Sequence, residues 1–228
     1  MLRHFGVTAA AKSQEQVETQ ELRMEINANL VRELRDKTGA GVMDCKKALA
    51  EASGDLEKAI VWLRERGVAQ AAGRSGKLAS EGSIGAYIHA GGKLGVLVEV
   101  NCESDFVAKT PEFQALVKEI AMQIAAANPR CVSREELPAE VIEQERQIYA
   151  AQAAGKPDPV VKKIVEGKLE KFYRDVCLSE QAWVRDPNRT ITDLLGEYVA
   201  KLGEKIEIRR FARFQLGESR DGHFPADA

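Results

Sequence analysis

The chain has 228 residues, which suffices for one compact domain and a smaller module. Its 33 Lys and Arg residues against 35 Asp and Glu residues give a formal net charge of −2. A nearly neutral chain lacks the broad positive field of most nucleic-acid-binding proteins, so we expect no direct contact with DNA or RNA. The apolar content of 44% predicts a buried core, and no apolar run approaches the roughly 18 residues of a membrane span.

The N-terminal segment and the cysteines give no sign of export or of metal binding. Residues 1–23 balance three basic with three acidic side chains and lack an apolar stretch of signal-peptide length, so we predict a polar leader, compatible with disorder. The cysteines form no CxxC pair and have no histidine at ligand spacing; they are Cys45, Cys102, Cys131 and Cys177. We expect free thiols in a reducing cytoplasm, and neither a metal nor a cofactor.

Helix signals divide residues 24–67 into three short helices. Each helix begins at a capping side chain or directly after a glycine, and glycines, which tolerate left-handed backbone, mark the ends. The predicted helices are 27–38, capped by Asn27 or Asn29, then 42–52, and finally a helix capped by Asp55 that ends at Gly67. A bundle this small is marginal alone, which suits docking more than catalysis.

A small, polar and poorly periodic segment, residues 68–80, is the predicted linker to a core of residues 81–218. Alternating and apolar runs predict three strands, at 83–90, 93–102 and 205–214, in an antiparallel sheet. The first run sets Ile84, Ala86 and Ile88 on one face. Residues 219–228 are a short tail.

Helical sequence lies between the second and third strands. Thr110, Pro111 and Glu112 are a strong start signal, since they combine a hydroxyl cap, a proline at the first helical position and an acid near the positive end of the helix dipole. Residues 139–154 and 159–176 form two further stripes joined by a turn, which predicts a helical hairpin. The fold class is therefore α+β: a three-helix bundle followed by a small antiparallel sheet with helices and a hairpin.

No nucleotide-binding loop or convincing catalytic group is evident. Residues 73–77 have the wrong spacing for GxxxxGK[ST], and residues 91–95 lie between two strands with no helix to hold phosphate. His89 and Cys102, on adjacent predicted strands, are a candidate base and thiol nucleophile, but no orienting group accompanies them. Binding is favoured over catalysis, with no catalytic residue assigned.

Two apolar features are candidates for binding a partner. Val42 and Met43 open the second helix after a glycine-rich turn, at the tip of the bundle. Asp105 and Phe106 follow the central strand directly and precede the next helix. The alternative for each is ordinary structure: core packing for the first pair, and for the second a loop in which Ser104 or Asp105 caps a turn and Phe106 enters the core. An exposed phenylalanine that enters a partner contributes about 2 to 3 kcal/mol.

Four segments carry a resemblance to a known family, translation elongation factor Ts. Residues 30–60 (LVRELRDKTGAGVMDCKKALAEASGDLEKAI) resemble its N-terminal module, and residues 99–113 (EVNCESDFVAKTPEF) resemble its signature loop. Residues 165–187 (VEGKLEKFYRDVCLSEQAWVRDP) and 205–218 (KIEIRRFARFQLGE) are similar to its later core. The likeness runs from Met24 to about Glu218.

The resemblance implies a guanine nucleotide exchange factor that binds elongation factor Tu with GDP and speeds GDP release. In the family the three-helix module, similar to ubiquitin-associated domains, docks on the partner's GTPase domain. An aspartate-phenylalanine pair intrudes near the magnesium and phosphate region of the nucleotide. Carried over by motif position, the docking residues are Arg35, Val42 and Met43, and the intruding residues are Asp105 and Phe106.

This sequence departs from the family pattern in three places. Val42 stands where the docking motif often has a first methionine, and an apolar contact is kept. Glu103 and Ser104 replace the commoner glutamine and threonine, and the hydroxyl is kept. His89 matches a histidine of the family core less closely, because Ala90 interrupts the His-Gly pattern, and it is a further predicted contact with elongation factor Tu.

The chain has room for one sheet and one hairpin, so it resembles the short form of the family, for which a homodimer is implied. An adaptor of the ubiquitin-associated type, with the core as an unrelated scaffold, is the alternative from another class. Such an adaptor would leave GDP release from elongation factor Tu unchanged, which separates the two.

Overall fold

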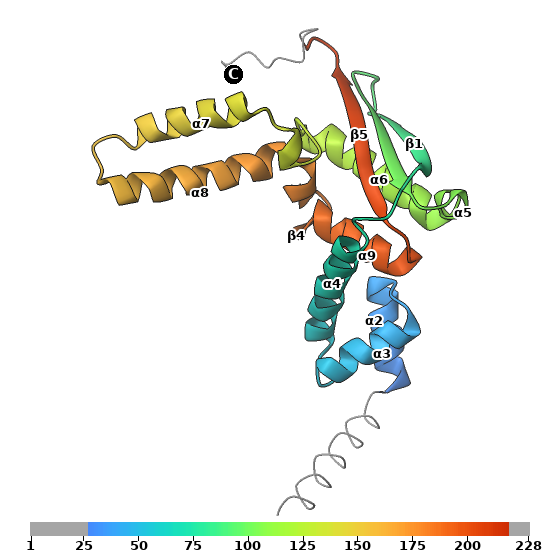
Figure 1. Ribbon diagram of the computed structural model, residues 1–228. Helices are drawn as coiled ribbons and strands as arrows, with labels where there is room; N and C mark the ends of the chain where they lie inside the picture. The colour runs from blue at the N-terminus through green and yellow to red at the C-terminus, as the bar shows by residue number, and fades with distance from the viewer. Residues whose placement is uncertain (1–26, 219–228) are drawn as a thin grey trace, which may run out of the picture.

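The structure is a computed structural model that describes residues 27–218. It is a mixed fold of helices and antiparallel sheet, as the sequence predicts, with a second, two-stranded sheet that the sequence did not predict. Figure 1 shows three parts: a three-helix module, a sheet backed by a helix, and a hairpin that projects sideways. The predicted leader at 1–23 and tail at 219–228 lie outside the described residues.

The N-terminal module consists of three helices around a small core. The helices are α2 (Ala28–Thr38), α3 (Val42–Glu51) and α4 (Leu56–Gly73). The Asn27 side chain accepts a hydrogen bond from the Asn29 N–H, and Asp55 accepts one from the Lys58 N–H, so both predicted caps are confirmed. The fully buried side chains of this core are Leu34, Cys45, Ala48, Leu49 and Ala59.

The third helix does not end at Gly67, as the sequence predicted, but continues to Gly73. Gly67 is buried inside α4, where it packs against Gly196 of the helix α9 (Ile191–Leu202). A glycine inside a helix costs about 1 kcal/mol relative to alanine, and here the close helix contact that it permits offsets that cost. The predicted linker at 68–80 therefore begins as helix, and only residues 74–80 connect the module to the sheet.

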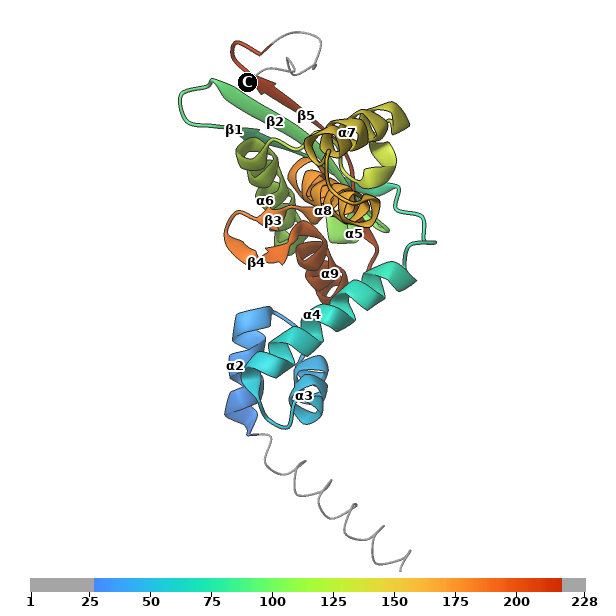
Figure 2. The ribbon, with the colours of Figure 1, turned by 90° about the vertical axis from the view of Figure 1, so that its left-hand side faces the viewer.

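The central sheet has three antiparallel strands in the order β1-β2-β5, which confirms the predicted antiparallel sheet. The strands are β1 (Glu81–Ile88), β2 (Leu94–Cys102) and β5 (Ile206–Gln215). Val96, Val98 and Val100 of β2 are buried against α6 (Pro111–Ala127), which lies on one face of the sheet (Figure 2). Thr110 caps α6, and Pro111 occupies its first turn, as predicted.

The apolar face of β1 points away from this core. An apolar face is ordinarily the buried one, yet Ile84 is 69% exposed and Ile88 is 67% exposed. The face toward α6 carries Gly85, where an added Cβ would lie 2.3 Å from the Val117 side chain. Because α6 approaches so closely at Gly85, the face of Gly85 and the partly buried Tyr87 is the inner one, and the apolar face is left at the surface.

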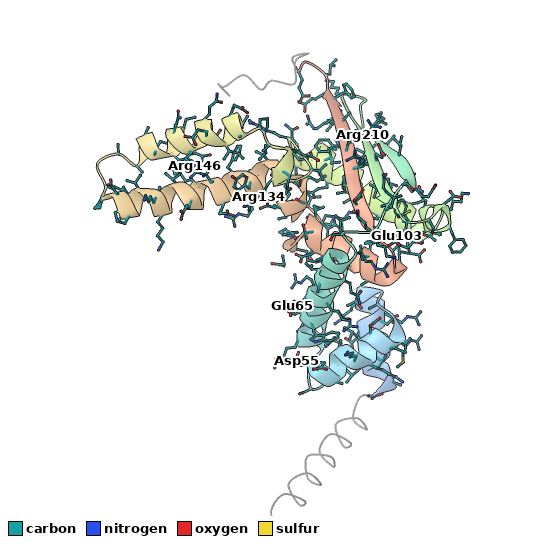
Figure 3. All side chains as sticks on the ribbon, viewed as in Figure 1. Asp55, Glu65, Glu103, Arg134, Arg146 and Arg210 are labelled. Atoms are coloured by element: carbon teal, nitrogen blue, oxygen red, sulfur yellow. The ribbon has the colours of Figure 1, made fainter. Side chains whose placement is uncertain are left out.

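The helical hairpin follows α6 and extends away from the sheet, to the left in Figure 1. It consists of α7 (Ala139–Gln152) and α8 (Asp158–Val176), preceded by the 3-10 turn η1 (Arg134–Glu136). Buried α8 side chains are Val165, Leu169, Phe172 and Val176, whereas no α7 residue is buried. At its base Arg134, labelled in Figure 3, contacts the carboxylates of Glu170 and Glu180.

The chain returns from the hairpin to the module and sheet through α9 (Ile191–Leu202). The 3-10 turn η2 (Leu178–Glu180) and the short strands β3 (Ala182–Trp183) and β4 (Asp186–Thr190) precede it. Thr190 and Asp193 form a capping box at the start of α9. Because α9 packs on α4 and leads directly into β5, it joins the module to the core.

Candidate partner-binding site

The tip of the module presents two apolar side chains to solvent. Val42 and Met43 begin α3 directly after Gly41, and they are 43% and 74% exposed. Arg35, in the last turn of α2, is also exposed. Neither Val42 nor Met43 belongs to the buried core of the module. Packing inside this chain therefore does not explain why an apolar side chain stands at either position.

A second exposed side chain lies beyond the end of the central strand. Phe106 is 82% exposed on α5 (Asp105–Ala108), a four-residue helix that follows β2. The adjacent Val107 and Ala108 are buried and anchor α5 to the core. The alternative in which Phe106 enters the core is therefore wrong.

Asp105 is exposed beside Phe106 and forms an ion pair with Lys109 one turn later. The hydrogen bond and charge of Asp105 raise the pKa of Lys109, so the ammonium stays protonated. Both groups are exposed and their pair is weak, so it leaves the Asp105 carboxylate free to exchange Lys109 for another partner.

The loop before Phe106 is held by a set of polar contacts that we call the loop clamp: Arg74, Glu103, Ser104 and Glu204. The Glu204 carboxylate accepts hydrogen bonds from the N–H groups of Glu103 and Ser104, at 3.1 and 3.0 Å, and from the Ser104 hydroxyl at 2.6 Å. In return, the Glu103 carboxylate accepts one from the Lys205 N–H, at 2.6 Å, and one from Arg74, at 3.0 Å. Glu103, labelled in Figure 3, lies near α5 and the start of β5.

His89 lies at the other end of the sheet from Phe106. It is exposed at the β1–β2 turn, where its ring Nδ1 lies 2.9 Å from the Tyr87 hydroxyl. Phe106 instead follows the far end of β2, and the eight-residue length of β1 corresponds to about 25 Å. The structure thus brings Asp105 and Phe106 together, and it separates His89 from both.

The register of the sheet also excludes the His89 and Cys102 nucleophile pair. Cys102 lies opposite Glu81 at the start of β1, whereas His89 follows the end of that strand. The Cys102 thiol is fully buried and donates to the Ser104 carbonyl at 3.2 Å. Burial raises its pKa, which suppresses the nucleophilic thiolate.

All four cysteines are free thiols, as predicted, and the structure shows that all four are buried. The Sγ atoms of Cys131 and Cys177 lie 3.6 Å apart at the base of the hairpin. Burial raises the pKa of the Cys131 thiol to about 12. Within residues 27–218 no group of three or more His, Cys, Asp or Glu side chains could hold a metal ion. No helix in that part of the chain combines the length and apolar character needed to cross a membrane.

Comparison with known proteins decides the family. A model described as "Elongation factor TS" matches residues 52–218, which is more than half of the chain. A second, described as "Elongation factor Ts, mitochondrial, N-terminal", matches residues 16–75.

The chain belongs to the elongation factor Ts family.

Bacterial relatives agree over most of the chain. The elongation factor Ts of Thermoanaerobacter sp. (strain X514) is 62% identical over 195 residues, which is 85% of this chain and 96% of the relative. Those of Anaeromyxobacter sp. (strain K) and Carboxydothermus hydrogenoformans are 61% and 60% identical, over 85% of this chain and 90% of each relative. The resemblance drawn from the sequence motifs is confirmed, and the chain is a translation elongation factor by family.

Sequence reasoning missed most of the loop clamp. It singled out Glu103 and Ser104 as departures from the family pattern and Ser104 also as a candidate cap, and it assigned no role to Arg74 or Glu204. Glu103 and Glu204 are 101 residues apart, and no local pattern signals that the Glu204 carboxylate binds the Glu103 N–H or that the Glu103 carboxylate binds the Lys205 N–H. A glutamate between a helix-ending glycine and a strand, as Gly203-Glu204 is, is ordinarily a solvated turn residue.

Proposed function

We propose that the chain is a guanine nucleotide exchange factor that binds elongation factor Tu with GDP and promotes GDP release. Arg35, Val42 and Met43 dock on the partner, and Asp105 and Phe106 enter near the magnesium and phosphate region. The observation that carries this proposal is the exposure of Phe106, 82%, on an otherwise anchored four-residue helix. Family membership supports the identity of the partner.

The mechanism requires only binding energy. A factor that binds its partner better without nucleotide makes the nucleotide bind worse to the complex by the same factor. Burying Phe106 contributes about 2 to 3 kcal/mol, which offsets displacement of the groups that organise magnesium and phosphate. GTP then binds the complex and ejects the factor. The mechanism therefore assigns no catalytic residue and no cofactor to this chain.

The two exposed sites have separate roles in this proposal. Met43 and Val42 supply docking that is equal for the GDP-bound and nucleotide-free partner, which sets the affinity. Phe106 and Asp105 act only where the nucleotide is held, which sets the rate of release. His89 remains a predicted contact, and its place at the β1–β2 turn would bring it to a part of the partner remote from Phe106.

A homodimer and a cytoplasmic location complete the proposal. The surface that supports the dimer is the outer sheet face, defined by Ile84, Ala86, Ile88, Leu97, Ala212 and Phe214. Leu97 lies between Ala86 and Ala212 in register, and Phe214 is 68% exposed. Such a face packs well on the same face of a second copy, because two sheets bury both apolar surfaces. In register with Ile84 the face also carries Glu99 and Arg210, which form an ion pair.

A linkage titration tests the exchange function. We expect the chain to bind nucleotide-free elongation factor Tu more tightly than the GDP-bound form, and the ratio of the two dissociation constants to equal the loss in GDP affinity. Isothermal titration calorimetry with each form measures both sides of this cycle. Equal affinity for the two forms would contradict the proposal, because such binding displaces no nucleotide.

A further inference from the structure

The helix that carries Phe106, α5, is too short to be stable without contacts to the rest of the chain. A four-residue helix has one turn, and isolated turns of this length do not persist in water. Phe106 adds no packing of its own, because 82% of it is exposed. The direction of its ring therefore depends on what fixes the two ends of α5. The C-terminal end is fixed by Val107 and Ala108 in the core.

The N-terminal end of α5 is fixed through Ser104. The Ser104 hydroxyl caps the helix by accepting a hydrogen bond from the Val107 N–H at 3.3 Å. The same hydroxyl donates to the Glu204 carboxylate at 2.6 Å, and the Ser104 N–H donates to it as well. Hydrogen bonds to an ionised carboxylate are about twice as strong as neutral ones. Glu204 thus sets the position of the capping residue, and through it the start of α5.

Glu103 ties the same loop to the module. Its carboxylate accepts hydrogen bonds from the Lys205 N–H and from Arg74, and these two partners hold its pKa below the usual range. Arg74 directly follows α4, the helix that begins at the module and packs on α9. The loop clamp therefore joins the end of a module helix, the loop before Phe106 and the turn before β5.

We infer that Glu204 is a positioning residue for nucleotide exchange: it holds Ser104 and Glu103 so that Phe106 projects in one direction before the partner arrives. Arg74 extends this restraint to the module that carries Met43. The inference rests on the exchange function proposed above. A side chain that is already ordered loses less conformational entropy on binding, so the clamp raises the fraction of encounters in which Phe106 enters.

The contacts of Glu204 separate this role from general stabilisation. Within residues 27–218 its side-chain hydrogen bonds reach only Glu103 and Ser104, and it takes no part in the apolar core of the sheet. Its side chain is partly exposed, so water can replace the lost partners when it is changed. Removing the charge of Glu204 is therefore expected to loosen the loop of Glu103 and Ser104 and to leave the apolar core of the sheet folded.

The variant Glu204→Gln tests the inference by exchange kinetics. The amide keeps the size of the side chain but loses the charge, so the hydrogen bonds from the Glu103 and Ser104 N–H groups lose their charge assistance. The amide nitrogen also cannot accept the proton of the Ser104 hydroxyl, which loosens the capping residue. We expect the maximal rate of GDP release at saturating factor to fall about tenfold, the equivalent of roughly 1.4 kcal/mol, with the half-saturating concentration unchanged. The matched control is Glu136→Gln, since Glu136 also accepts a backbone N–H, from Val132 at 2.8 Å, but at the hairpin. This control should exchange like the unaltered chain.

A double-variant cycle shows whether Glu204 acts through Phe106. If it does, Glu204→Gln slows exchange in the unaltered chain but not in the Phe106→Ala variant, because no ring remains to be positioned. Equal slowing in both backgrounds would overturn the inference. It would mean that Glu204 affects exchange by another route.

A spectroscopic readout keeps the inference testable if exchange itself is absent. In the chain labelled with fluorinated phenylalanine, the Phe106 resonance is assigned by its loss in Phe106→Ala. We expect Glu204→Gln to narrow this resonance and shift it toward the free amino acid, and Arg74→Met to shift it less in the same direction. Glu136→Gln should leave it unchanged. An unshifted resonance in Glu204→Gln would overturn the clamp, whereas a shifted resonance without any exchange activity would refute only the proposed function.

Discussion

Gly67 of α4 and Gly196 of α9 touch backbone to backbone. A Cβ added at Gly67 would lie 2.8 Å from the Gly196 carbonyl oxygen, and one added at Gly196 would lie 2.8 Å from the Val68 nitrogen. Such contacts cannot be relieved by turning a side chain, because the atoms met are backbone. The crossing of these two helices, visible in Figure 2, therefore fixes the module relative to the core.

We predict that Gly67→Ala disturbs this crossing. Overpacking of this kind costs about 1 to 3 kcal/mol, against which the gain in helix propensity is about 1 kcal/mol. The module should shift on the core, so the concentration of factor needed for half-maximal exchange rises and the midpoint of thermal unfolding falls. The control is Gly73→Ala, in the same helix but with nothing within 4 Å of the added Cβ. Equal behaviour of the two variants would show that the crossing is not a constraint.

Phe106→Ala separates function from folding. Because the ring is 82% exposed, its removal should change the free energy of unfolding by less than about 0.5 kcal/mol. The maximal rate of GDP release should nevertheless fall, since the ring is buried only in the complex. Phe113→Ala is the opposite control: Phe113 is fully buried, and its loss should cost about 3 to 5 kcal/mol. Unfolding in urea and exchange kinetics, measured on both variants, test the contrast.

Met43→Ala is expected to affect affinity rather than the maximal rate. Met43 is 74% exposed at the tip of the module and distant in sequence from the Phe106 loop. Loss of one apolar anchor should raise the half-saturating concentration about five- to tenfold, with the rate at saturation preserved. A titration of the exchange rate against factor concentration measures both quantities. An unaltered titration would remove Met43 from the docking surface.

The outer sheet face should hold the homodimer together. Leu97→Lys places a charge at the centre of this face, and we expect a monomer by sedimentation equilibrium at micromolar concentration. Because Leu97 is 48% exposed in the single chain, the fold should persist. Val184→Lys is the matched control, since Val184 is equally exposed but lies at the β3–β4 turn. A dimer that survives Leu97→Lys would assign the interface to another surface.

The raised pKa of the Cys131 thiol predicts that the folded protein loses stability at alkaline pH. Burial first, and then the neighbouring Cys177, raise its pKa from 9.0 to about 12. The unfolded thiol loses its proton near pH 9, so the stabilising contribution is complete below that pH and is lost as the pH rises toward 12. The free energy of unfolding, measured from pH 8 to 11, should fall less steeply in Cys131→Ala. Parallel slopes for the two proteins would contradict the assignment.

The sequence predicted what local chemistry controls. Asn27, Asp55 and Thr110 are caps as expected, because a cap depends only on the next three residues. The predicted end of α4 was wrong. Gly67 reads as a helix stop signal, but the glycine is needed there because α9, distant in the sequence, packs against its backbone. The exposed face of β1 was not foreseen either, since only the close approach of α6 shows which face is inner.

The candidate site divides in the same way. Phe106 and Met43 could be found from their sequence context, because each follows a predicted element boundary directly. The loop clamp could not, since Glu103 and Glu204 meet only after the sheet has formed.

Release of fluorescent GDP from elongation factor Tu, followed by stopped flow, tests the central claim most directly. With excess unlabelled GDP present, the release rate should rise with the concentration of this chain and reach a plateau, and Phe106→Ala should lower that plateau. If the release rate at micromolar concentrations of the chain equals the rate without it, the chain does not act as an exchange factor on this partner.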